Sequence, residues 1–512
     1  MSGPRSLSIR IDRDSRVPAY QQIAGAIRDA IHAGRFDDGE RLASTRALAA
    51  RLGIHRNTAV AAYRSLESAG LLRAGVGAGS FVVAPVMPAA VPGEAAEGTP
   101  PFAWRRLLRD PQALEGDPRQ WLSARHLPVP PDAIQLTGAI AERKQFPLED
   151  LAGCLRAVLD DAGPGILDYG PTEGDERLRE WIVEQLREWG AGEIDIERVF
   201  IVSGSQQGLD LIGKLLLAPG DAVVLEAPTY TGAFLSLRHA GARLVTVPMG
   251  EAGLDLDALE ALLEHEPVKF LYTMPCFQNP TGISLGSAER DRLLGLARRY
   301  RLAIIEDHYD TDLYYSGQRP RPLLGDDREG QVIHLGTFSK ILFPGLRIGW
   351  LVIPAGLADS LRQIRWATDL ASATLAQRAL ERFCRAGYLD DHLRRIRRVN
   401  ARRLRAMLRA LEEHFPAAAR WTRPGGGMTL WAELPAAVDT VELFHQAAAR
   451  GVLFSPGIAF YPNGGGRNAM RLSFNRESEA RIQRGIALLG EMIAERLSVS
   501  EKGRPALEEP LL

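Results

Sequence analysis

One lysine of the chain lies in surroundings that suit covalent chemistry. Lys340 follows the apolar stretch Val332–Leu335 and the hydroxyl residues Thr337 and Ser339, and Arg347 comes seven residues later. Apolar neighbours and a nearby cation both disfavour an ammonium, so they lower the pKa of a lysine. Such a lysine can form a Schiff base with an aldehyde cofactor, while the hydroxyls and Arg347 would hold a phosphate. The other interpretation is a buried strand whose last lysine reaches back to solvent.

Polar side chains also follow other apolar stretches between residues 198 and 352. These stretches alternate with helical patterns, which predicts a mainly parallel α/β sheet covered on both faces. In such a sheet the carboxyl ends of the strands meet at one edge, so we expect the polar residues there to form one site. The expected strands are Arg198–Val202, Ala222–Leu225, Arg243–Val247, Phe270–Met274, Ala303–Glu306, Val332–Leu335 and Arg347–Val352.

The residues at four of these strand ends suit a flat ring with polar substituents. Tyr230 presents an aromatic face on which such a ring could stack. Asp307, at a buried strand end, needs a cationic partner that a pyridinium N–H would supply. The amide of Asn279 and the phenol of Tyr309 would contact a ring hydroxyl.

The turn Ser203–Gly208 precedes an expected helix, Leu209–Leu217, and would offer N–H groups to an anion. Ser205 and Gln206 lie in this turn, although an ordinary capped helix would look the same. Taken with the ring contacts and the lysine, the turn indicates pyridoxal 5′-phosphate (PLP) on Lys340. Asp307 would keep the ring nitrogen protonated, so that the ring acts as an electron sink.

The stretch Tyr169–Gly174, together with Leu178 and Arg179, resembles the N-terminal signature of the fold-type I aminotransferases. The resemblance covers residues 134–497. It implies that Tyr169 reaches the cofactor phosphate of the neighbouring subunit, and hence a head-to-tail homodimer. It also assigns Asn279 and Tyr309 to the ring hydroxyl, Asp307 to the ring nitrogen, and Thr337, Ser339, Arg347 and Ser205 to the phosphate.

Arg471, in the stretch 470–474, matches the arginine with which these aminotransferases clamp the α-carboxylate of a substrate. The chemistry agrees, because a guanidinium grips a carboxylate with two parallel hydrogen bonds. The alternative is an arginine in a surface salt bridge.

The first 84 residues predict a winged helix-turn-helix. Helical patterns cover residues 18–33, 44–52 and 56–69, and two short strands flank the glycines at 75–79. The third helix would enter the major groove of double-stranded DNA with Arg56, Asn57 and Thr58 foremost. Ser44 and Arg46 would reach backbone phosphates. The alternative is a protein-interaction domain with a solvated arginine face.

This segment resembles the GntR-type winged helix in Pro18–Ile23, Gly39–Leu42, Ser44–Ala49, Arg56–Thr58 and Gly77–Val82. It departs from that family at residues 74–76, where Ala-Gly-Val replaces the usual basic residue of the wing. A GntR-type reader fused to an aminotransferase-like body resembles the MocR family of transcriptional regulators. That resemblance implies a PLP-dependent regulator whose body senses an amine, an amino acid or PLP itself through Lys340, with little or no turnover.

Two other functions stay open from the sequence. One is a working aminotransferase with an appended DNA-binding domain, because all its catalytic positions are present. The other is a PLP-binding scaffold without affinity for DNA, which only the altered wing supports. Sequence alone identifies neither the effector nor the operator.

The composition and charge of the chain limit its possible functions and its location. The 512 residues carry a formal net charge of −1, but residues 1–84 hold 12 arginines, no lysine and seven acidic residues, which suits a polyanion partner at that end. Cys154, Cys276 and Cys384 follow no metal or disulfide spacing. No secretion signal and no membrane-spanning stretch is evident, so we expect a cytoplasmic protein.

The expected organisation has four parts. Residues 1–84 form the DNA-binding domain, residues 85–131 a linker, and residues 132–497 the fold-type I PLP-dependent transferase domain. The transferase domain divides into a large part, about 165–370, and a small part, about 371–497 with the N-terminal stretch. Residues 498–512 form a disordered tail.

Overall fold

The computed structural model describes residues 18–32, 36, 40–68, 71–75, 79–82, 129–138 and 142–502. The chain divides into two compact units, Met1–Trp104 and Arg105–Leu512. The expected linker lies outside the described residues up to residue 128, and so does the tail after Lys502. In the described parts, no helix is both long enough and apolar enough to cross a membrane.

The first unit is a winged helix-turn-helix, as the sequence predicts. The Ser44 hydroxyl accepts a hydrogen bond from the N–H of Ala47 and so caps the second helix, which ends at Gly53 in the left-handed conformation, φ 62°. Ile23, Leu48 and Leu66 are buried together between the three helices. The elements are α1 (Ala19–His32), α2 (Thr45–Leu52), α3 (Arg56–Ser68), β1 (Leu72–Gly75) and β2 (Gly79–Val82).

The second unit centres on an eight-stranded sheet with the order β4-β11-β10-β9-β8-β5-β6-β7. The four central pairings, from β10 through β6, are parallel, and the pairs β4–β11, β11–β10 and β6–β7 are antiparallel. This arrangement confirms the expected mainly parallel sheet. The strands are β4 (Val199–Val202), β5 (Ala222–Ala227), β6 (Arg243–Gly250), β7 (Gly253–Leu254), β8 (Phe270–Thr273), β9 (Ala303–His308), β10 (Val332–Thr337) and β11 (Gly349–Val352).

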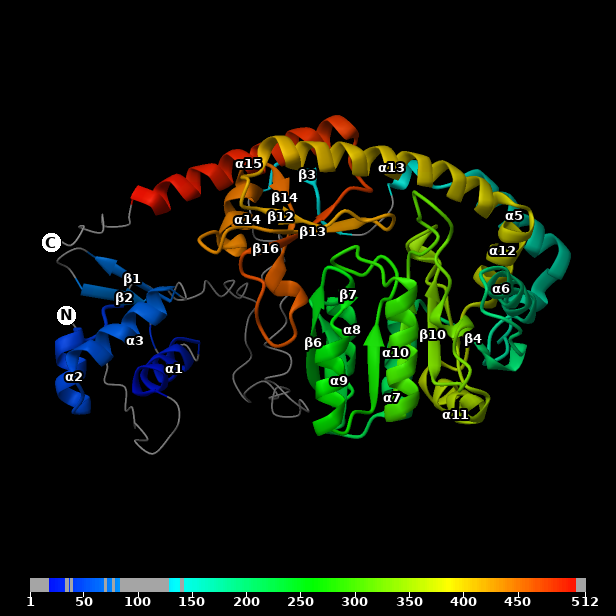
Figure 1. Cartoon of the computed structure of the whole chain (residues 1–512), viewed down its shortest axis with the longest axis horizontal. Coiled ribbons are helices and arrows are strands. Elements are labelled where there is room, and N and C mark those ends of the chain that lie inside the picture. The colour runs from blue at the N-terminus through cyan, green and yellow to red at the C-terminus, as the bar shows by residue number, and fades with distance from the viewer. Residues whose placement is uncertain are drawn as a thin grey trace, which may run out of the picture. The chain divides into compact units, whose positions relative to one another are not determined.

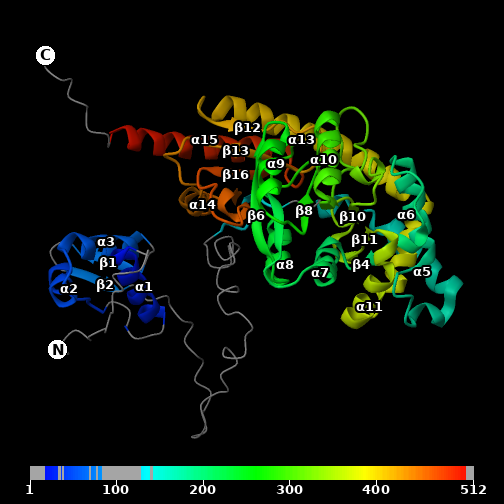
Figure 2. The ribbon, with the colours of Figure 1, turned by 60° about the horizontal axis from the view of Figure 1, so that its bottom comes forward.

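Helices between the strands cover this sheet, and Figures 1 and 2 show α7 to α10 lying along it. The strands β4, β8 and β10 are buried along their whole length, and β5 is buried except at its last residue, Ala227, which is why they read as continuous apolar runs. The helices of the large part are α5 (Leu148–Ala162), α6 (Glu176–Glu188), α7 (Ser205–Leu216), α8 (Thr231–His239), α9 (Leu256–His265), α10 (Ser287–Tyr300), α11 (Ala358–Asp369) and α12 (Thr374–Arg385).

The small part has its own hydrophobic core and a four-stranded antiparallel sheet, β12-β13-β16-β15. The long helix α13 joins the two parts, as Figure 1 shows: Leu389 and Leu393 belong to the large core, and Met407 and Leu411 to the small one. The N-terminal strand β3 (Ile134–Gln135) pairs with β14 (Val452–Leu453) in the small part. The remaining elements are β12 (Arg420–Trp421), β13 (Thr429–Glu433), β15 (Ser455–Pro456), β16 (Ala469–Ser473), α13 (Tyr388–His414), α14 (Thr440–Ala449) and α15 (Glu479–Lys502).

Several element boundaries differ from those expected, and three of the differences concern the site or the end of the domain. Helix α7 begins at Ser205, four residues early, because Gly204 at φ 77° turns the chain directly into the helix. Strand β11 begins at Gly349, because Arg347 adopts a left-handed conformation, φ 53°. Helix α15 continues to Lys502, five residues beyond the expected end of the domain at 497.

Candidate cofactor site and DNA-binding surface

The large sheet brings the expected site residues to one edge. Strands β4, β5, β8, β9 and β10 end there, and β11 begins there because it runs antiparallel to both of its neighbours. Gly349 pairs with Thr337 on one side and with Val202 on the other, so Arg347 lies between the ends of β10 and β4. The residues that reach this edge are Ser205, Gln206, Tyr230, Asn279, Asp307, Tyr309, Thr337, Ser339, Lys340 and Arg347.

An anion cradle forms where β4, α7 and β10 meet. The Arg347 guanidinium donates to the carbonyl oxygen of Ser203, 2.9 Å from Nη2, and to the hydroxyl of Ser339, 3.5 Å from Nη1. The Thr337 hydroxyl accepts the N–H of Ser339 at 3.1 Å. Helix α7 begins at Ser205 without a side-chain cap, so its first N–H groups face the same place. A guanidinium, hydroxyls and a helix N-terminus together suit a phosphate.

Gly204 offers a test of this cradle. Its φ of 77° suits only glycine, and a Cβ atom there would lie 2.5 Å from Nη2 of Arg347. Gly204→Ala should therefore displace Arg347 and weaken PLP binding about tenfold, as measured by a fluorescence titration. The substitution should also lower the stability of the fold by about 1–3 kcal/mol through backbone strain. Gly220→Ala is the control, because Gly220 has φ 92° but open space around it. Equal losses in the two variants would show that backbone strain alone acts.

Asp307 is buried with one carboxylate oxygen free. The phenol of Tyr272 donates to Oδ2 at 2.7 Å, whereas Oδ1 has no hydrogen-bond partner in the described structure. Burial raises the pKa of Asp307 to about 7, although the Tyr272 hydrogen bond and the nearby Lys340 lower it. The free oxygen is a ready acceptor for an N–H group that carries positive charge.

Tyr230 and Gln206 are tied together, because the phenol donates to Oε1 of Gln206 at 3.4 Å and Nε2 of Gln206 donates to the carbonyl oxygen of Gly232 at 2.9 Å. Tyr309 donates its own hydrogen to the carbonyl oxygen of Phe277, 2.8 Å away. Its hydroxyl oxygen can therefore only accept a hydrogen bond from a ring substituent. The sequence did not indicate this second partner.

Arg471 is buried rather than on the surface, so the alternative of a surface salt bridge is wrong. Its guanidinium donates to Oδ1 of Asn279 at 3.0 Å and to the hydroxyl of Ser455 at 3.2 Å, both neutral groups. It stacks 4.7 Å from the ring centroid of Phe460. Burial lowers the pKa of Arg471 to about 10. A buried cation held by neutral partners can accept a carboxylate without breaking an existing ion pair.

Lys340 lies among the charged groups of the site. Burial lowers the pKa of its amine, and the Arg471 cation adds to this effect. The Asp310 and Asp307 carboxylates oppose the shift, while Arg347 supports it. The amine therefore loses its proton more readily than an exposed lysine does, which is the condition for attack on an aldehyde.

The N-terminal end of α3 is the exposed end of the expected recognition helix. Arg56 and Asn57 are exposed and Thr58 is half-buried, whereas Ala59, Ala62 and Leu66 on the same helix are buried. Arg46 on α2 is exposed as well, while the Ser44 hydroxyl already caps α2. Polar groups at this end and an apolar body behind them are the geometry of a helix that enters a DNA groove.

Comparison with known families agrees with both parts of the chain. Residues 144–488 match the model of aminotransferase class I and II, and residues 19–82 match the bacterial regulatory proteins of the gntR family. The probable rhizopine catabolism regulatory protein MocR of Rhizobium meliloti is 33% identical over 87% of this chain and 88% of its own length. The chain belongs to the MocR-type regulators.

The aminotransferase part of this MocR-type chain has relatives among enzymes. Aromatic-amino-acid aminotransferase 1 of Thermococcus litoralis is 40% identical over 72% of this chain and 89% of its own length. The solved structure of the α-aminoadipate aminotransferase LysN of Thermus thermophilus, in complex with N-(5′-phosphopyridoxyl)-L-leucine, superposes with a TM-score of 0.71. It is 36% identical and covers 78% of this chain and all of that one.

The cofactor of class I and II aminotransferases is PLP, and the residues of this MocR-type chain fit it. The free Oδ1 of Asp307 suits a ring nitrogen that carries a proton. The cradle around Arg347 suits a phosphate, and it is kept open by Gly204, where a side chain would collide with the guanidinium. Asp307 and Arg347 both act on the pKa of Lys340, which Asp307 raises and Arg347 lowers.

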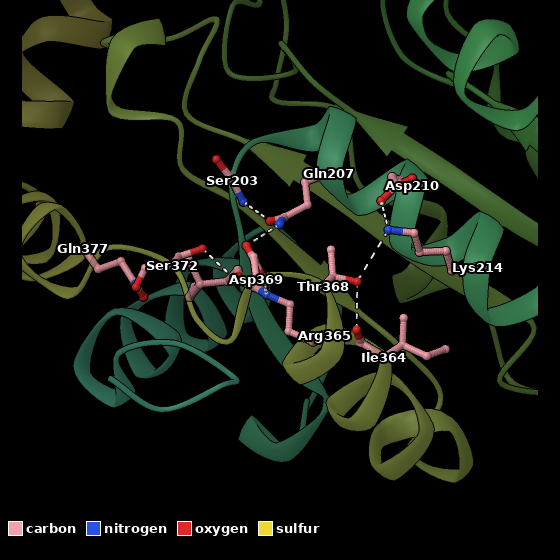
Figure 3. A network of polar contacts seen from close by, with 11 residues as sticks. Ser203, Gln207, Asp210, Lys214, Ile364, Arg365, Thr368, Asp369, Ser372 and Gln377 are labelled. Atoms are coloured by element: carbon pink, nitrogen blue, oxygen red, sulfur yellow. Dashed lines mark hydrogen bonds and ion pairs between the residues drawn. The ribbon is translucent and has the colours of Figure 1, made fainter. Parts of the chain in front are cut away.

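A buried arginine supports the phosphate cradle from behind (Figure 3). Gln207 accepts the N–H of Ser203 and donates to Asp369, each at 2.5 Å. Arg365, which is fully buried, donates to Asp369 at 2.7 Å and to the hydroxyl of Ser372 at 2.7 Å. The start of α7 is therefore fixed to the loop that joins α11 and α12. No pattern in the sequence had indicated this network.

Within one chain, Tyr169 does not belong to the cluster of residues that forms the candidate cofactor site. Its side chain is 89% exposed, and it lines a surface hollow of about 370 Å³ with Thr374 and Arg378. Gly170 lies directly against Thr374, where an added Cβ would be 2.2 Å from the hydroxyl. An exposed tyrosine on a tightly packed loop is free to meet a second chain.

Two residues of the site had escaped the reasoning from sequence, Tyr272 and Ser455. In the sequence, Tyr272 looks like one more core residue of an apolar strand. Its phenol reaches Asp307 only because the strands β8 and β9 are neighbours in the sheet. Ser455 lies in the small part, 16 residues before Arg471, and only the pairing of β15 with β16 brings them together. Strand pairing between segments so far apart leaves no local signal.

Proposed function

We propose that the chain is a DNA-binding transcriptional regulator that carries PLP on Lys340 and responds to an amine, an amino acid or PLP itself. The observation that carries this proposal is that one chain combines an exposed recognition helix with a buried site whose charges lack partners. Asp307 and Arg471 each keep an unpaired polar atom in the described structure. A sensor needs such atoms, because its ligand supplies the missing partners.

The residues would share the work as follows. Arg347, with Thr337, Ser339 and the Ser205 end of α7, holds the phosphate. Asp307 keeps a proton on the ring nitrogen, and Arg471 binds the carboxylate of an amino-acid effector. When bound, PLP supplies an aldehyde carbon that reacts with amines. The remaining assignments place Tyr230 on the ring face, Gln206 beside Ser205 in the turn that opens α7, and Asn279 and Tyr309 at the ring hydroxyl.

The regulator would act as a head-to-tail homodimer. Tyr169 would contact the phosphate held by the second copy, which explains why an aromatic side chain is so exposed. Leu167, Trp366 and Leu370 are also exposed, and they lie in the segments next to Tyr169 and Thr374. A dimer interface over these exposed residues would bring two winged helices into one assembly, as binding to two half-sites on DNA requires. Sedimentation of the holoprotein should give a dimer, and a Tyr169→Ala dimer should bind PLP more weakly.

DNA binding is tested by footprinting the purified full chain on the region upstream of its own gene. We expect protection of a discrete site, with a change in its extent or affinity when PLP and an active amine are present. The affinity should fall steeply with salt, since phosphate contacts release counterions. Absence of protection both with and without PLP would refute the regulator.

Arg56 is the residue of α3 with which the DNA contact is best measured. Arg56→Ala should weaken binding to the protected site by about 5- to 150-fold, the effect of about 1–3 kcal/mol from one bidentate base contact. Arg64→Ala is the matched control, because it removes the same charge from an exposed position farther along the same helix. Fluorescence anisotropy with the operator and with a scrambled duplex checks it. Equal losses in both variants would mean that Arg56 contributes charge only.

A working aminotransferase is the second candidate. Relatives that are 36–40% identical in the same part of the chain are named as aminotransferases. Sustained conversion of an amino acid and a keto acid at about 1–10³ per second would support this function. A single half-reaction without turnover would instead support the sensor.

A further inference from the structure

In the described structure, Tyr272 is the one group that donates a hydrogen bond to the carboxylate of Asp307. The phenol lies 2.7 Å from Oδ2, and the two residues are 0% and 2% exposed. Strands β8 and β9 run parallel, and Tyr272 is paired with Ile305, which lies two residues before Asp307. Side chains two residues apart on a strand share one face of the sheet, so strand pairing itself brings the phenol to the carboxylate.

The other buried carboxylates that act on the pKa of Asp307 are better supplied with hydrogen bonds. They belong to Glu226 and Glu306, and each has three hydrogen-bond partners in the described structure. These partners are the hydroxyl of Thr273, the N–H of Met274 and Nε2 of Gln278 for Glu226, and the N–H groups of Leu323 and Leu324 and Nδ1 of His334 for Glu306. A buried anion with few donors is unfavourable, so the charge of Asp307 depends on Tyr272 to an unusual degree.

The proton balance of Asp307 lies near neutrality. Burial raises its pKa to about 7, and the hydrogen bond from Tyr272 is the largest effect in the opposite direction, ahead of Lys340. The titratable groups that act on Asp307 or Tyr272 are Lys340, Glu226, Glu306, Tyr309, Asp310 and Tyr230.

One proton would be shared between Asp307 and a ring nitrogen placed at its free oxygen, Oδ1. That proton can lie on the nitrogen, which leaves an ionised carboxylate, or on the carboxylate, which leaves a neutral pair. A phenol that donates to Oδ2 stabilises the ionised form, because a hydrogen bond to a charged acceptor is stronger than one to a neutral acceptor. The hydrogen bond from Tyr272 therefore favours the proton on the nitrogen.

We propose that Tyr272 is a positioning residue that acts through Asp307, because its hydrogen bond to Oδ2 holds the carboxylate ionised and aligned, so that the ring nitrogen of PLP keeps its proton. This inference rests on the proposed function, since it needs PLP at this site. A protonated ring is the stronger electron sink. Tyr272 would thus tune, from a neighbouring strand, how readily the bound cofactor reacts with an effector amine.

The test is solid-state NMR of the full-length holoprotein loaded with PLP that carries ¹⁵N at the ring nitrogen, because the ¹⁵N shift reports whether that nitrogen holds a proton. At neutral pH the wild-type chain should give the protonated shift. Tyr272→Phe removes only the hydroxyl and should move the shift toward the unprotonated value. Tyr315→Phe is the matched control, because its phenol donates to the carbonyl oxygen of Gly427 instead, and it should keep the wild-type shift.

A cofactor analogue separates this effect from damage to the fold. In 1-deaza-PLP a carbon replaces the ring nitrogen, so the analogue keeps the aldehyde and the phosphate but cannot share a proton with Asp307. In fluorescence titrations Tyr272→Phe should weaken the binding of PLP about tenfold and that of the analogue less than about twofold. Asp307→Asn removes the carboxylate, so adding Tyr272→Phe to it should change neither the ¹⁵N shift nor the affinity further.

A protonated ¹⁵N shift in Tyr272→Phe would overturn the proposal, because Asp307 would then keep the nitrogen protonated without the phenol. An unprotonated shift in the wild-type chain would overturn it as well. Equal losses of affinity for PLP and for 1-deaza-PLP would also contradict it, since Tyr272 would then support only the shape of the site. So would a further change when Tyr272→Phe is added to Asp307→Asn. Failure of the wild-type chain to bind PLP would instead refute the proposed function.

Discussion

Lys340→Ala should remove the visible absorption band of the holoprotein completely, and borohydride should no longer fix the cofactor to the chain. Under the proposed function the amine of Lys340 is the nucleophile, since burial and Arg471 lower its pKa, and Asp307 and Arg347 cannot form the covalent bond in its place. In the wild-type chain, reduction followed by peptide mapping should find the cofactor mass on the peptide that contains Lys340. A band that survives in Lys340→Ala would mean that the site is wrongly assigned.

Lys269→Ala is the control for this variant. Lys269 is exposed, pairs with Asp221 at 3.3 Å and precedes β8, so it lies at the opposite edge of the sheet from the site. It should keep the band and the trapped peptide. The DNA complex gives an independent readout, since Lys340→Ala should bind the operator but lose any response to amines. A response equal to that of the wild-type chain would exclude Lys340 as the sensing group.

The architecture of this site was predictable because each part of it produces a local pattern in the sequence. A parallel strand buried on both faces reads as an apolar run, and its carboxyl end is the next polar residue. Asp307, Asn279 and Lys340 could therefore be found one strand at a time. The order of the strands was not predictable, since β11 lies between β4 and β10 although 146 residues separate the end of β4 from the start of β11. Only that order explains why Arg347 reaches Ser203.

Interactions across distant segments set the limit of sequence reasoning. The sequence analysis did not single out Arg365, yet it is fully buried, because the carbonyl oxygen of Ile201, Asp369 and Ser372 surround its guanidinium. Arg471 was assigned by family resemblance, with a surface position as the alternative, because a single arginine in a strand does not reveal its burial. Its partners Asn279 and Ser455 come from two other segments. A buried charge becomes visible only when the fold supplies its neighbours.

Arg471→Gln should abolish the preference of the protein for effectors that carry a carboxylate. The guanidinium is buried, its Nε has no partner in the described structure, and its two Nη groups bind neutral side chains. A carboxylate placed there would gain charge-assisted hydrogen bonds in a site of low polarity. Truncating one partner of such a buried pair costs about 2–5 kcal/mol, so the affinity for an amino acid should fall by about 30-fold to more than 1,000-fold.

Matched ligands separate this effect from damage to the cofactor site. L-phenylalanine and phenethylamine share the amine and the side chain and differ in the carboxylate, as L-alanine and ethylamine do. Spectral titration of the wild-type holoprotein should favour the amino acid in each pair, and Arg471→Gln should bind both members about equally. Arg471→Lys should recover only part of the preference, because an ammonium cannot form the two parallel hydrogen bonds. Loss of the plain amine together with the amino acid would mean that Arg471 supports the site as a whole.

The same substitution has an opposite expected effect on stability. In the free protein Arg471 is a buried cation without an opposite charge beside it, and the lowering of its pKa to about 10 reflects the cost of its desolvation. Arg471→Gln removes that cost and keeps a donor for Asn279, so its thermal midpoint without effector should equal or exceed that of the wild-type chain. Saturating amino acid should raise the midpoint of the wild-type chain only. The protein would thus be less stable without a bound carboxylate than with one. This free-energy difference between the free and the bound state is what a sensor needs.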